Sequence, residues 1–428
     1  MSASPTTRSA KRLGLGILST LASSMLLMPA AYADVGTDVA QAFKDGKANV
    51  AFRYRYENVD QDNFSKDANA STLRSRISFQ TAAWQDLTLM LELDDIRSLG
   101  DESYNSTRNG NTDRPNVLDP VATDLNVAAL KYMGIANAEI IVGRQKIARG
   151  NERFVGPVGW RQNEQTYDAA SVNYKFSDKL QAYYAYVRQV NRVVGPDNGS
   201  GIPPADFNGN THLADLSYTF SPAAKLTAYG YFLDLEEPLS GSALPDSSSS
   251  QTLGLRLAGD IKLNEQFGIP YAAEWATQDD YADNPNNYSA DYYLAEAGVR
   301  WQKVTAKLSY EVLEGDTVAN HQFQTPLATL HAFQGWADQF LSTPTGGIED
   351  TFLTVDFPVL GANIKLRYDD YQSETGSVDY GNELGIWATL PIGTNYSLAV
   401  KYAAFDADNE APTYFDTDKF WVMFSANF

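Results

Sequence analysis

Four arginines at alternate positions in two short segments of this chain suggest a surface that attracts anions. Arg53 and Arg55 lie in the segment KANVAFRYRYENV, and Arg74 and Arg76 lie in the segment LRSRISFQT. Successive side chains of a β-strand point to opposite faces, so each arginine pair shares one face and apolar side chains share the other. In a pore, a face of fixed guanidinium groups favours anions.

The N-terminal residues indicate where such a surface would lie. Residues 1–33 contain three basic residues, an apolar run and the small-residue pattern Ala31-Tyr32-Ala33. This combination is typical of a secretory signal peptide that is cleaved before Asp34. A membrane-anchor helix is the alternative, and the short apolar run and the cleavage pattern disfavour it. We therefore expect export through the inner membrane, with residues 34–46 as a periplasmic N-terminal segment.

Composition excludes several classes of exported protein. The chain has no cysteine and therefore no disulfide framework. Its formal net charge is -20, and residues 1–33 carry three of its positive charges, so the mature chain is more acidic still. Such an acidic chain is a poor candidate for binding nucleic acid. Aromatic residues make up 12% of the chain, and no mature segment is apolar enough for a spanning helix, which together favour an outer-membrane β-barrel.

The periodicity along the chain supports the barrel. We find eighteen segments in which apolar and polar residues alternate, from Lys47 to Phe428. Short connections, such as 134–137, alternate with longer polar ones, such as 95–124. Short periplasmic turns and long extracellular loops are typical of outer-membrane barrels, and the last strand ends on the aromatic Phe428. The sequence thus predicts an all-β fold, a single transmembrane antiparallel barrel of about 18 strands over residues 47–428, in the bacterial outer membrane and in contact with its lipid.

In a barrel of this size the apolar faces meet lipid and the polar faces line the lumen. The basic residues predicted to point inward are Arg53, Arg55, Arg74, Arg76, Arg256, Arg300, Lys307, Lys365, Arg367 and Lys401. Acids share the inward phase, namely Glu57, Glu92, Asp94, Glu274, Glu296, Glu311, Asp356, Asp369 and Glu383. Two interpretations remain open: the arginines form a basic track for an anionic solute, or they pair with the acids and stabilise the wall.

Two longer segments resemble a known family. GRQKIARGNERFVGPVGWRQNEQTYD (143–168) and TLHAFQGWADQFLSTPTGG (329–347), together with the RYRYE and LRSR stretches, are similar to segments of the alginate-export outer-membrane proteins. The resemblance implies an eighteen-stranded barrel that passes a uronate polysaccharide through an arginine-lined lumen. It also implies pore-lining roles for Arg53, Arg55, Arg74, Arg76, Arg144 and Arg161. The loops of this chain are rather short and its lumen is rich in acids, which departs from the family.

Two loops are expected to enter the lumen. Glycines at positions 150, 156 and 159 predict a structured loop over residues 146–165, in which Trp160, Arg161 and Gln162 either contact a sugar or anchor the loop, the anchor being favoured. Residues 326–341 carry apolar side chains at spacings of three and four, which predicts an amphipathic helix within a long loop, 315–349, that narrows the pore.

Other functions receive less support from the sequence. The three histidines, His212, His321 and His331, and the absence of a G-x-S-x-G motif give no basis for an enzyme. Acidic loops could bind Ca²⁺ weakly but lack an EF-hand spacing, so no cofactor or metal is expected. We therefore predict a passive channel for an anionic polysaccharide or a small anionic solute, for which a periplasmic export scaffold is a possible partner. Uptake of small solutes by a porin is the alternative to export.

Overall fold

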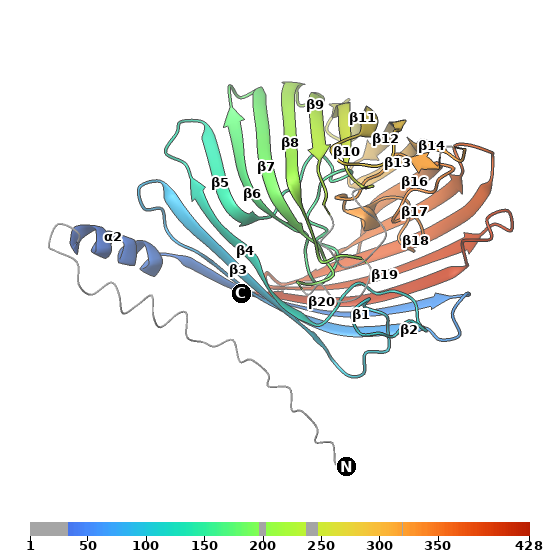
Figure 1. Cartoon of the computed structure of the whole chain (residues 1–428), viewed down its shortest axis with the longest axis horizontal. Coiled ribbons are helices and arrows are strands. Elements are labelled where there is room, and N and C mark those ends of the chain that lie inside the picture. The colour runs from blue at the N-terminus through green and yellow to red at the C-terminus, as the bar shows by residue number, and fades with distance from the viewer. Residues whose placement is uncertain (1–32, 197–202, 237–246, 319) are drawn as a thin grey trace, which may run out of the picture.

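The computed structural model describes residues 33–196, 203–236, 247–318 and 320–428 of the 428-residue chain, and these form a β-barrel (Figure 1). The strands that build the barrel wall are β1 Lys47–Gln61, β2 Ala68–Gln80, β3 Leu87–Ser98, β4 Ala122–Tyr132, β5 Ala138–Gln145, β6 Thr166–Lys175, β7 Leu180–Asn191, β8 Asp206–Ser221, β9 Ala224–Leu233, β10 Ser250–Lys262, β11 Phe267–Asp280, β12 Ser289–Trp301, β13 Val304–Leu313, β16 Ile348–Val359, β17 Ala362–Gln372, β18 Asp379–Ile392, β19 Tyr396–Ala407 and β20 Thr417–Asn427.

These strands form one 18-stranded antiparallel sheet within the described residues, and each strand pairs with the next along the chain. The first and last strands also pair, with Phe52 opposite Ala426 and Tyr56 opposite Val422, so the sheet closes on itself. Closure removes both sheet edges, and every wall strand therefore has two hydrogen-bonded neighbours. The strand number and the antiparallel order predicted from the sequence are confirmed.

The two faces of each strand differ as the alternation predicts. Large apolar side chains point out of the barrel, as Phe52, Ile77 and Leu308 illustrate with exposed fractions of 40%, 54% and 59%. Their sequence neighbours on the opposite face are charged or polar, such as Arg76 beside Ile77. This arrangement gives the barrel an apolar outer band and a polar interior, which an outer-membrane barrel requires.

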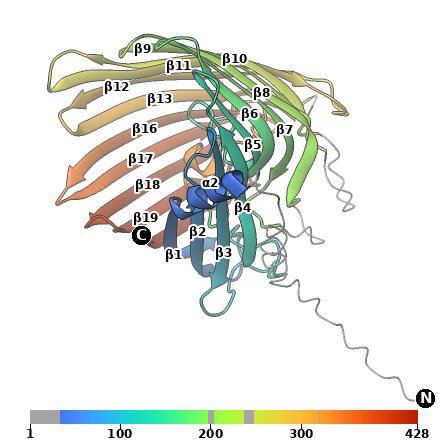
Figure 2. The same cartoon turned by 90° about the vertical axis from the view of Figure 1, so that its left-hand side faces the viewer.

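The two ends of the barrel differ in their connections. Strands are joined at one end by short turns, such as 360–361, and at the other by longer loops, such as 314–347. Helix α2 (Ala33–Lys44) lies at the short-turn end, where β1 begins, and the amide of Ala82 donates to the carbonyl of Ala42 there (Figure 2). The predicted signal peptide lies outside the described residues, except for Ala33. No helix in the described ranges is long and apolar enough to cross a membrane.

Three loops fold into the barrel and fill much of its interior. They are residues 99–121, 146–165 and 314–347; the last includes the small hairpin β14 (Gly315–Asp316) and β15 (His321–Gln322). The second and third join through a bridge between Val155 and Leu327. Aromatic residues of the loops and of the wall form a shared buried cluster that includes Phe154, Tyr229, Tyr292, Phe323 and Phe340. The predicted inward course of the 146–165 and 315–349 loops is thus confirmed.

The predicted helix over residues 326–341 is wrong. Only the 3₁₀ turn η2 (Leu330–Ala332) forms in this segment. Gln334, Gly335 and Asp338 have φ angles of 46°, 81° and 61°, which interrupt any helix. Trp336 and Phe340 nevertheless bury their rings, at 4% and 5% exposure, because the chain turns repeatedly to direct them into different parts of the wall.

The face assignment can be tested by placing a charge on either face of β13. Leu308→Arg would put a cation on the lipid face and should destabilise the barrel by roughly 2–4 kcal/mol if it lies near the midplane. Thr305→Arg faces the lumen opposite Asp356 on β16 and should be tolerated. Urea unfolding from lipid vesicles measures both. Equal destabilisation by the two changes would show that the faces are assigned wrongly.

Candidate pore constriction

The interior loops meet the wall in a layer of ion pairs near the middle of the barrel. On β1, the Arg55 guanidinium lies 2.7 Å from Glu57 and 3.7 Å from Asp119 of the 99–121 loop. Arg161 of the 146–165 loop lies 3.1 Å from Glu57 and 3.9 Å from Asp119. All four side chains are nearly inaccessible, at 6% exposure or less. Two wall charges and two loop charges therefore neutralise one another where neither water nor lipid is available.

Asp338 extends this layer into the 314–347 loop. One of its oxygens, Oδ2, accepts from Lys419 Nζ at 2.7 Å and from Arg161 Nη2 at 3.1 Å, while Oδ1 lies 2.6 Å from His331 Nδ1. Burial alone would raise the pKa of Asp338, but the hydrogen bond from His331 and the charges of Lys419 and Arg161 hold this pKa well below its usual range. Asp338 is therefore ionised at neutral pH and links two loops to strand β20.

Lys401 on β19 occupies a cage of aromatic rings. Its ammonium lies 4.0 Å from the ring centre of Trp336, 4.3 Å from that of Trp160, 4.9 Å from that of Trp387 and 5.4 Å from that of Trp421. Cation–π attraction of this kind strengthens when the cation is desolvated. The ammonium also lies 2.6 Å from His331 Nε2.

His331 is neutral, and its neighbours fix the proton on one nitrogen. Burial, with the positive charges of Lys401 and Arg161, lowers the pKa of His331 to about 3, despite the opposing effect of Asp338. Because the ionised Asp338 can only accept, Nδ1 carries the proton and donates to it, and Nε2 is left to accept from Nζ of Lys401. The ring also stacks on Trp160 with centres 4.2 Å apart. The layer is thus held by hydrogen bonds and stacking as well as by charge.

A cavity lies on each side of this layer. The outer cavity, of about 280 Å³, is lined from the long-loop end by residues that include Gln61, Asn116, Arg161, Asp338 and Lys419. The inner cavity, of about 450 Å³, opens toward the short turns and is lined by residues that include Arg53, Trp160, His331, Trp387, Lys401 and Ser425. Chain neighbours such as Trp160 and Arg161 line opposite cavities, so this part of the layer separates the two and forms a partition between them.

The lining of the inner cavity includes basic side chains. Arg53 and Lys401 line it, and no carboxylate does, among the residues that the structure describes. Arg53 holds the 146–165 loop instead: its guanidinium donates to the Gln162 side chain at 2.9 Å and to the carbonyls of Gly159 and Arg161. Gln162 in turn contacts Thr72 of β2 at 2.9 Å. These contacts confirm the predicted role of the loop residues as an anchor.

Most of the predicted pathway cations are ion-paired within 4 Å. Arg74 lies 3.9 Å from Glu164, and Arg76 makes two contacts of 2.6 Å to Asp94 and lies 3.1 Å from Glu164. Farther around the wall the pairs are Arg256 with Glu274, Arg300 with Asp260, Lys365 with Asp356, and Arg367 with Asp350 and Asp369. With Arg55 and Arg161, these cations fit the wall-stabilising interpretation. Arg53 and Lys401 have no carboxylate within 4 Å among the described residues and fit the basic track.

Arg144 does not face the lumen, contrary to the prediction. In β5 it shares a face with Val142, which is 53% exposed, whereas Gln145 on the other face is buried and contacts Ser171. Arg144 pairs with Asp168 at 2.7 Å and also lies 3.5 Å from Asp124 of β4. Gly143, with φ at 119°, precedes it in the strand.

Several residues of the layer were not identified from the sequence as a site. Lys419, Asp119 and Asp338 form its contacts, and Trp387 and Trp421 form part of the cage. The inward phase of β18 and β20 could have indicated the two tryptophans, which are unusual in a polar lumen. The loop acids carried no such signal, because their positions depend on how the loops fold back into the barrel.

Comparison with known proteins identifies the family. The sequence profile described as alginate export matches residues 47–329, more than half of the chain. The chain belongs to the alginate-export family. This membership and the closed barrel place it among the channel proteins of the bacterial outer membrane. A comparison with curated proteins finds no match.

Solved structures show the same fold. Pseudomonas aeruginosa OccK3 (OpdO) aligns with a TM-score of 0.66 at 12% identity, covering 92% of this chain and 98% of its own. Acinetobacter baumannii OccAB2 aligns with a TM-score of 0.68 at 14% identity, covering 91% and 99%. Pseudomonas aeruginosa OpdQ aligns with a TM-score of 0.66 at 13% identity over 91% and 99%. At these identities the likeness establishes the barrel and no particular solute.

The wall-stabilising pairs can be tested at Arg76. Arg76→Gln would leave the fully buried Asp94 carboxylate without its two short contacts and should lower the free energy of unfolding by about 3–5 kcal/mol. Arg97→Gln removes an exposed pair with Asp95 at the end of the same hairpin and should cost at most about 1 kcal/mol. Urea unfolding measures both, and similar losses would contradict the structural role of Arg76.

Proposed function

We propose that this protein is a passive outer-membrane channel for anionic solutes, and that Arg53 and Lys401 give the passage its preference for anions. The observation that carries the proposal is the inner cavity, which two cations line without a carboxylate. Positive side chains in a narrow, partly desolvated passage raise the local concentration of anions and repel cations. The mature chain is acidic overall, so this preference is a local property of the pathway.

Family membership favours an anionic polysaccharide as the solute, and a uronate polymer would meet the same two cations. A small anionic solute is the alternative, and the partition between the cavities favours it, because a polymer strand needs a continuous passage. Export and uptake both remain compatible with a passive channel. For export, a periplasmic scaffold would meet the short-turn end, where α2 lies.

We propose no catalytic role. His331 and Asp338 form a hydrogen-bonded pair, which on other proteins supports nucleophilic catalysis. Here the second ring nitrogen is occupied by the Lys401 ammonium, and His331 is only 6% exposed. Neither a hydroxyl nor a thiol has a place beside that nitrogen in the contacts described. The pair supports the fold of the constriction.

Reversal potentials across a planar bilayer under a salt gradient test the proposal. Arg53→Gln should lower the preference for anions severalfold, and Arg53→Lys should retain it because the charge remains. The effect should be larger in dilute salt, because the screening length falls from about 30 Å at 0.01 M to about 3 Å at 1 M.

Lys262→Gln is the matched control. Lys262 is an exposed cation at a short turn, paired with Glu265, and its removal should leave the reversal potential unchanged. A folded Arg53→Gln channel with the reversal potential of the wild type would contradict the assignment of Arg53. Loss of anion preference in Arg53→Lys as well would show that loop anchoring, rather than charge, controls selectivity.

A further inference from the structure

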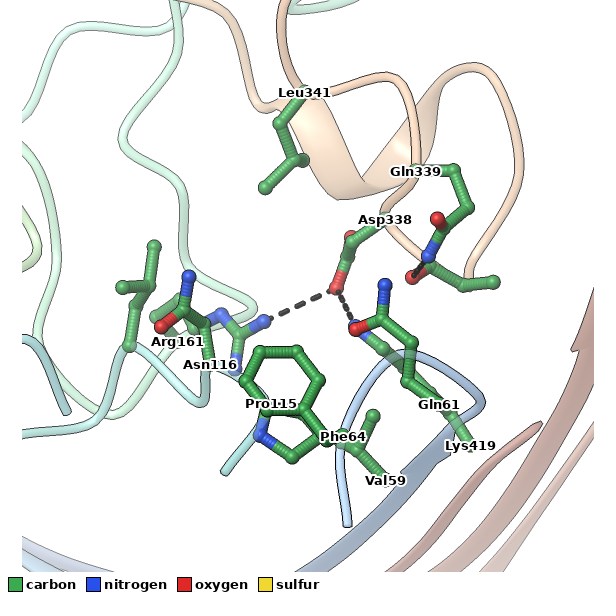
Figure 3. Close-up of a pocket in the computed structure, with 12 residues that line it drawn as sticks. Val59, Gln61, Phe64, Pro115, Asn116, Arg161, Asp338, Gln339, Leu341 and Lys419 are labelled. Atoms are coloured by element: carbon green, nitrogen blue, oxygen red, sulfur yellow. Dashed lines mark hydrogen bonds and ion pairs between the residues drawn. The ribbon is translucent and has the colours of Figure 1, made fainter. Parts of the chain in front are cut away.

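The outer cavity contains a pair of cations that share one carboxylate, Asp338. Figure 3 shows Arg161 and Lys419 converging on Asp338 from different elements, with Asn116, Gln61 and other polar and apolar side chains around them. Nη2 of Arg161 and Nζ of Lys419 both donate to the same oxygen of Asp338. Among the described residues, two cations and one carboxylate line the cavity, and Arg161 is also paired with Glu57 in the layer beneath.

The two cations differ in how firmly they are otherwise held. Arg161 keeps a second contact through Nη1 to Glu57, at 3.1 Å, which fixes the guanidinium in the layer. Lys419 has no ion pair within 4 Å other than Asp338 in the described residues. Removal of Asp338 would therefore leave the fixed guanidinium of Arg161 and a released Lys419 ammonium as donors beside the outer cavity. Such an arrangement suits a carboxylate, whose oxygens accept several hydrogen bonds.

Asp338 also joins two of the interior loops to each other. Its contact to Arg161 joins the 314–347 loop to the 146–165 loop, directly beside the stack of Trp160 on His331. Trp160 and His331 line the inner cavity, whereas Arg161 and Asp338 line the outer one. The Arg161–Asp338 contact is thus part of the partition itself.

The backbone around Asp338 depends on its contacts. Gln334, Gly335 and Asp338 all have positive φ, and non-glycine residues keep such conformations only where surrounding interactions fix them. The amides of Trp336 and Ala337 donate to the carboxylate of Glu383 on β18, which holds the preceding turn to the wall. Release of Asp338 would therefore free the end of the segment while the wall-side contacts remain.

We propose that the outer cavity is a binding site for the carboxylate of an incoming solute, which displaces Asp338 from Lys419 and Arg161 and thereby opens the seam between the two loops. The inference rests on the proposed function, because it assumes that an anionic solute reaches this cavity. It adds a device that couples the arrival of the solute to the opening of its passage.

Exchange of one carboxylate for another at the same donors is chemically balanced and needs no proton transfer. The tethered Asp338 competes at the high effective concentration of an intramolecular group, on the order of millimolar or above, so the solute must be present at comparable concentration. The resulting weak binding suits a channel, in which a solute must leave as readily as it enters.

Single-channel recording with acetate as the probe tests the inference. At constant ionic strength, acetate replaces HEPES, a bulky sulfonate, and currents are normalised to the conductivity of each solution. Open probability of the wild type should rise with acetate, and acetamide, which has a similar size and no charge, should have no effect. Without acetate, the open probability of Asp338→Asn should be roughly tenfold that of the wild type, and acetate should not change it. A tenfold change corresponds to about 1.4 kcal/mol, which is near the lower end of the range for a hydrogen bond to a charged group.

Asp113→Asn is the matched control, because Asp113 pairs with Lys66 in an exposed contact at the loop end, and it should retain the acetate response. Should Asp338→Asn fail to fold, Lys419→Gln provides a second variant: because it removes one of the two donors that hold Asp338, it should be more open than the wild type without acetate and should respond less to acetate. No rise with acetate in the wild type, or an equal rise in folded Asp338→Asn, would overturn the inference.

The outcomes also separate this inference from the proposed function. An anion-selective channel that ignored acetate would contradict only the displacement of Asp338. A channel that opened with acetate but showed no preference for anions would contradict the selectivity assigned to Arg53 and Lys401.

Discussion

A barrel of eighteen strands encloses more space than its wall side chains can fill, and the charges that line this space need partners. Arg161 makes the contacts on which the filling of this space and the pairing of its charges depend. It approaches Glu57 of the wall, Asp119 of one loop and Asp338 of another, all within 4 Å. A single guanidinium thus joins the wall and three interior loops, and the narrow passage follows from that junction.

The need of interior charges for partners also explains how an acidic chain acquires a positive passage. Most inward cations form ion pairs with carboxylates of the wall, as Arg76 does with Asp94, so their charges are neutralised along the wall. Arg53 escapes pairing because its donors hold loop carbonyls and an amide. Lys401 escapes because indole rings surround it and neutral His331 accepts its hydrogen bond. Charge that remains unpaired is therefore concentrated along the inner cavity.

The sequence predicted the barrel better than the site, for a physical reason. Alternation in segments such as KANVAFRYRYENV is local, because each strand must present one face to lipid, so strand number, order and the phase of Arg53 and Arg76 could be predicted. Loop structure depends on distant partners: the apolar spacing in 326–341 suggested a helix, but Trp336 and Phe340 bury into separate parts of the wall. The pore-lining role of Arg144 was predicted from the family resemblance. The alternation of Val142 and Gln145 in the same strand would have placed Arg144 on the outward face.

The partition between the two cavities is the central claim, and thiol labelling from each side of a bilayer tests it most directly. The chain has no cysteine, so Asn116→Cys reports on the outer cavity and Ser425→Cys on the inner one. With a bulky maleimide–polyethylene glycol reagent, we predict that current falls for Asn116→Cys only when the reagent is on the long-loop side, and for Ser425→Cys only when it is on the short-turn side. Reaction of both cysteines from the same side would contradict a closed layer between the cavities.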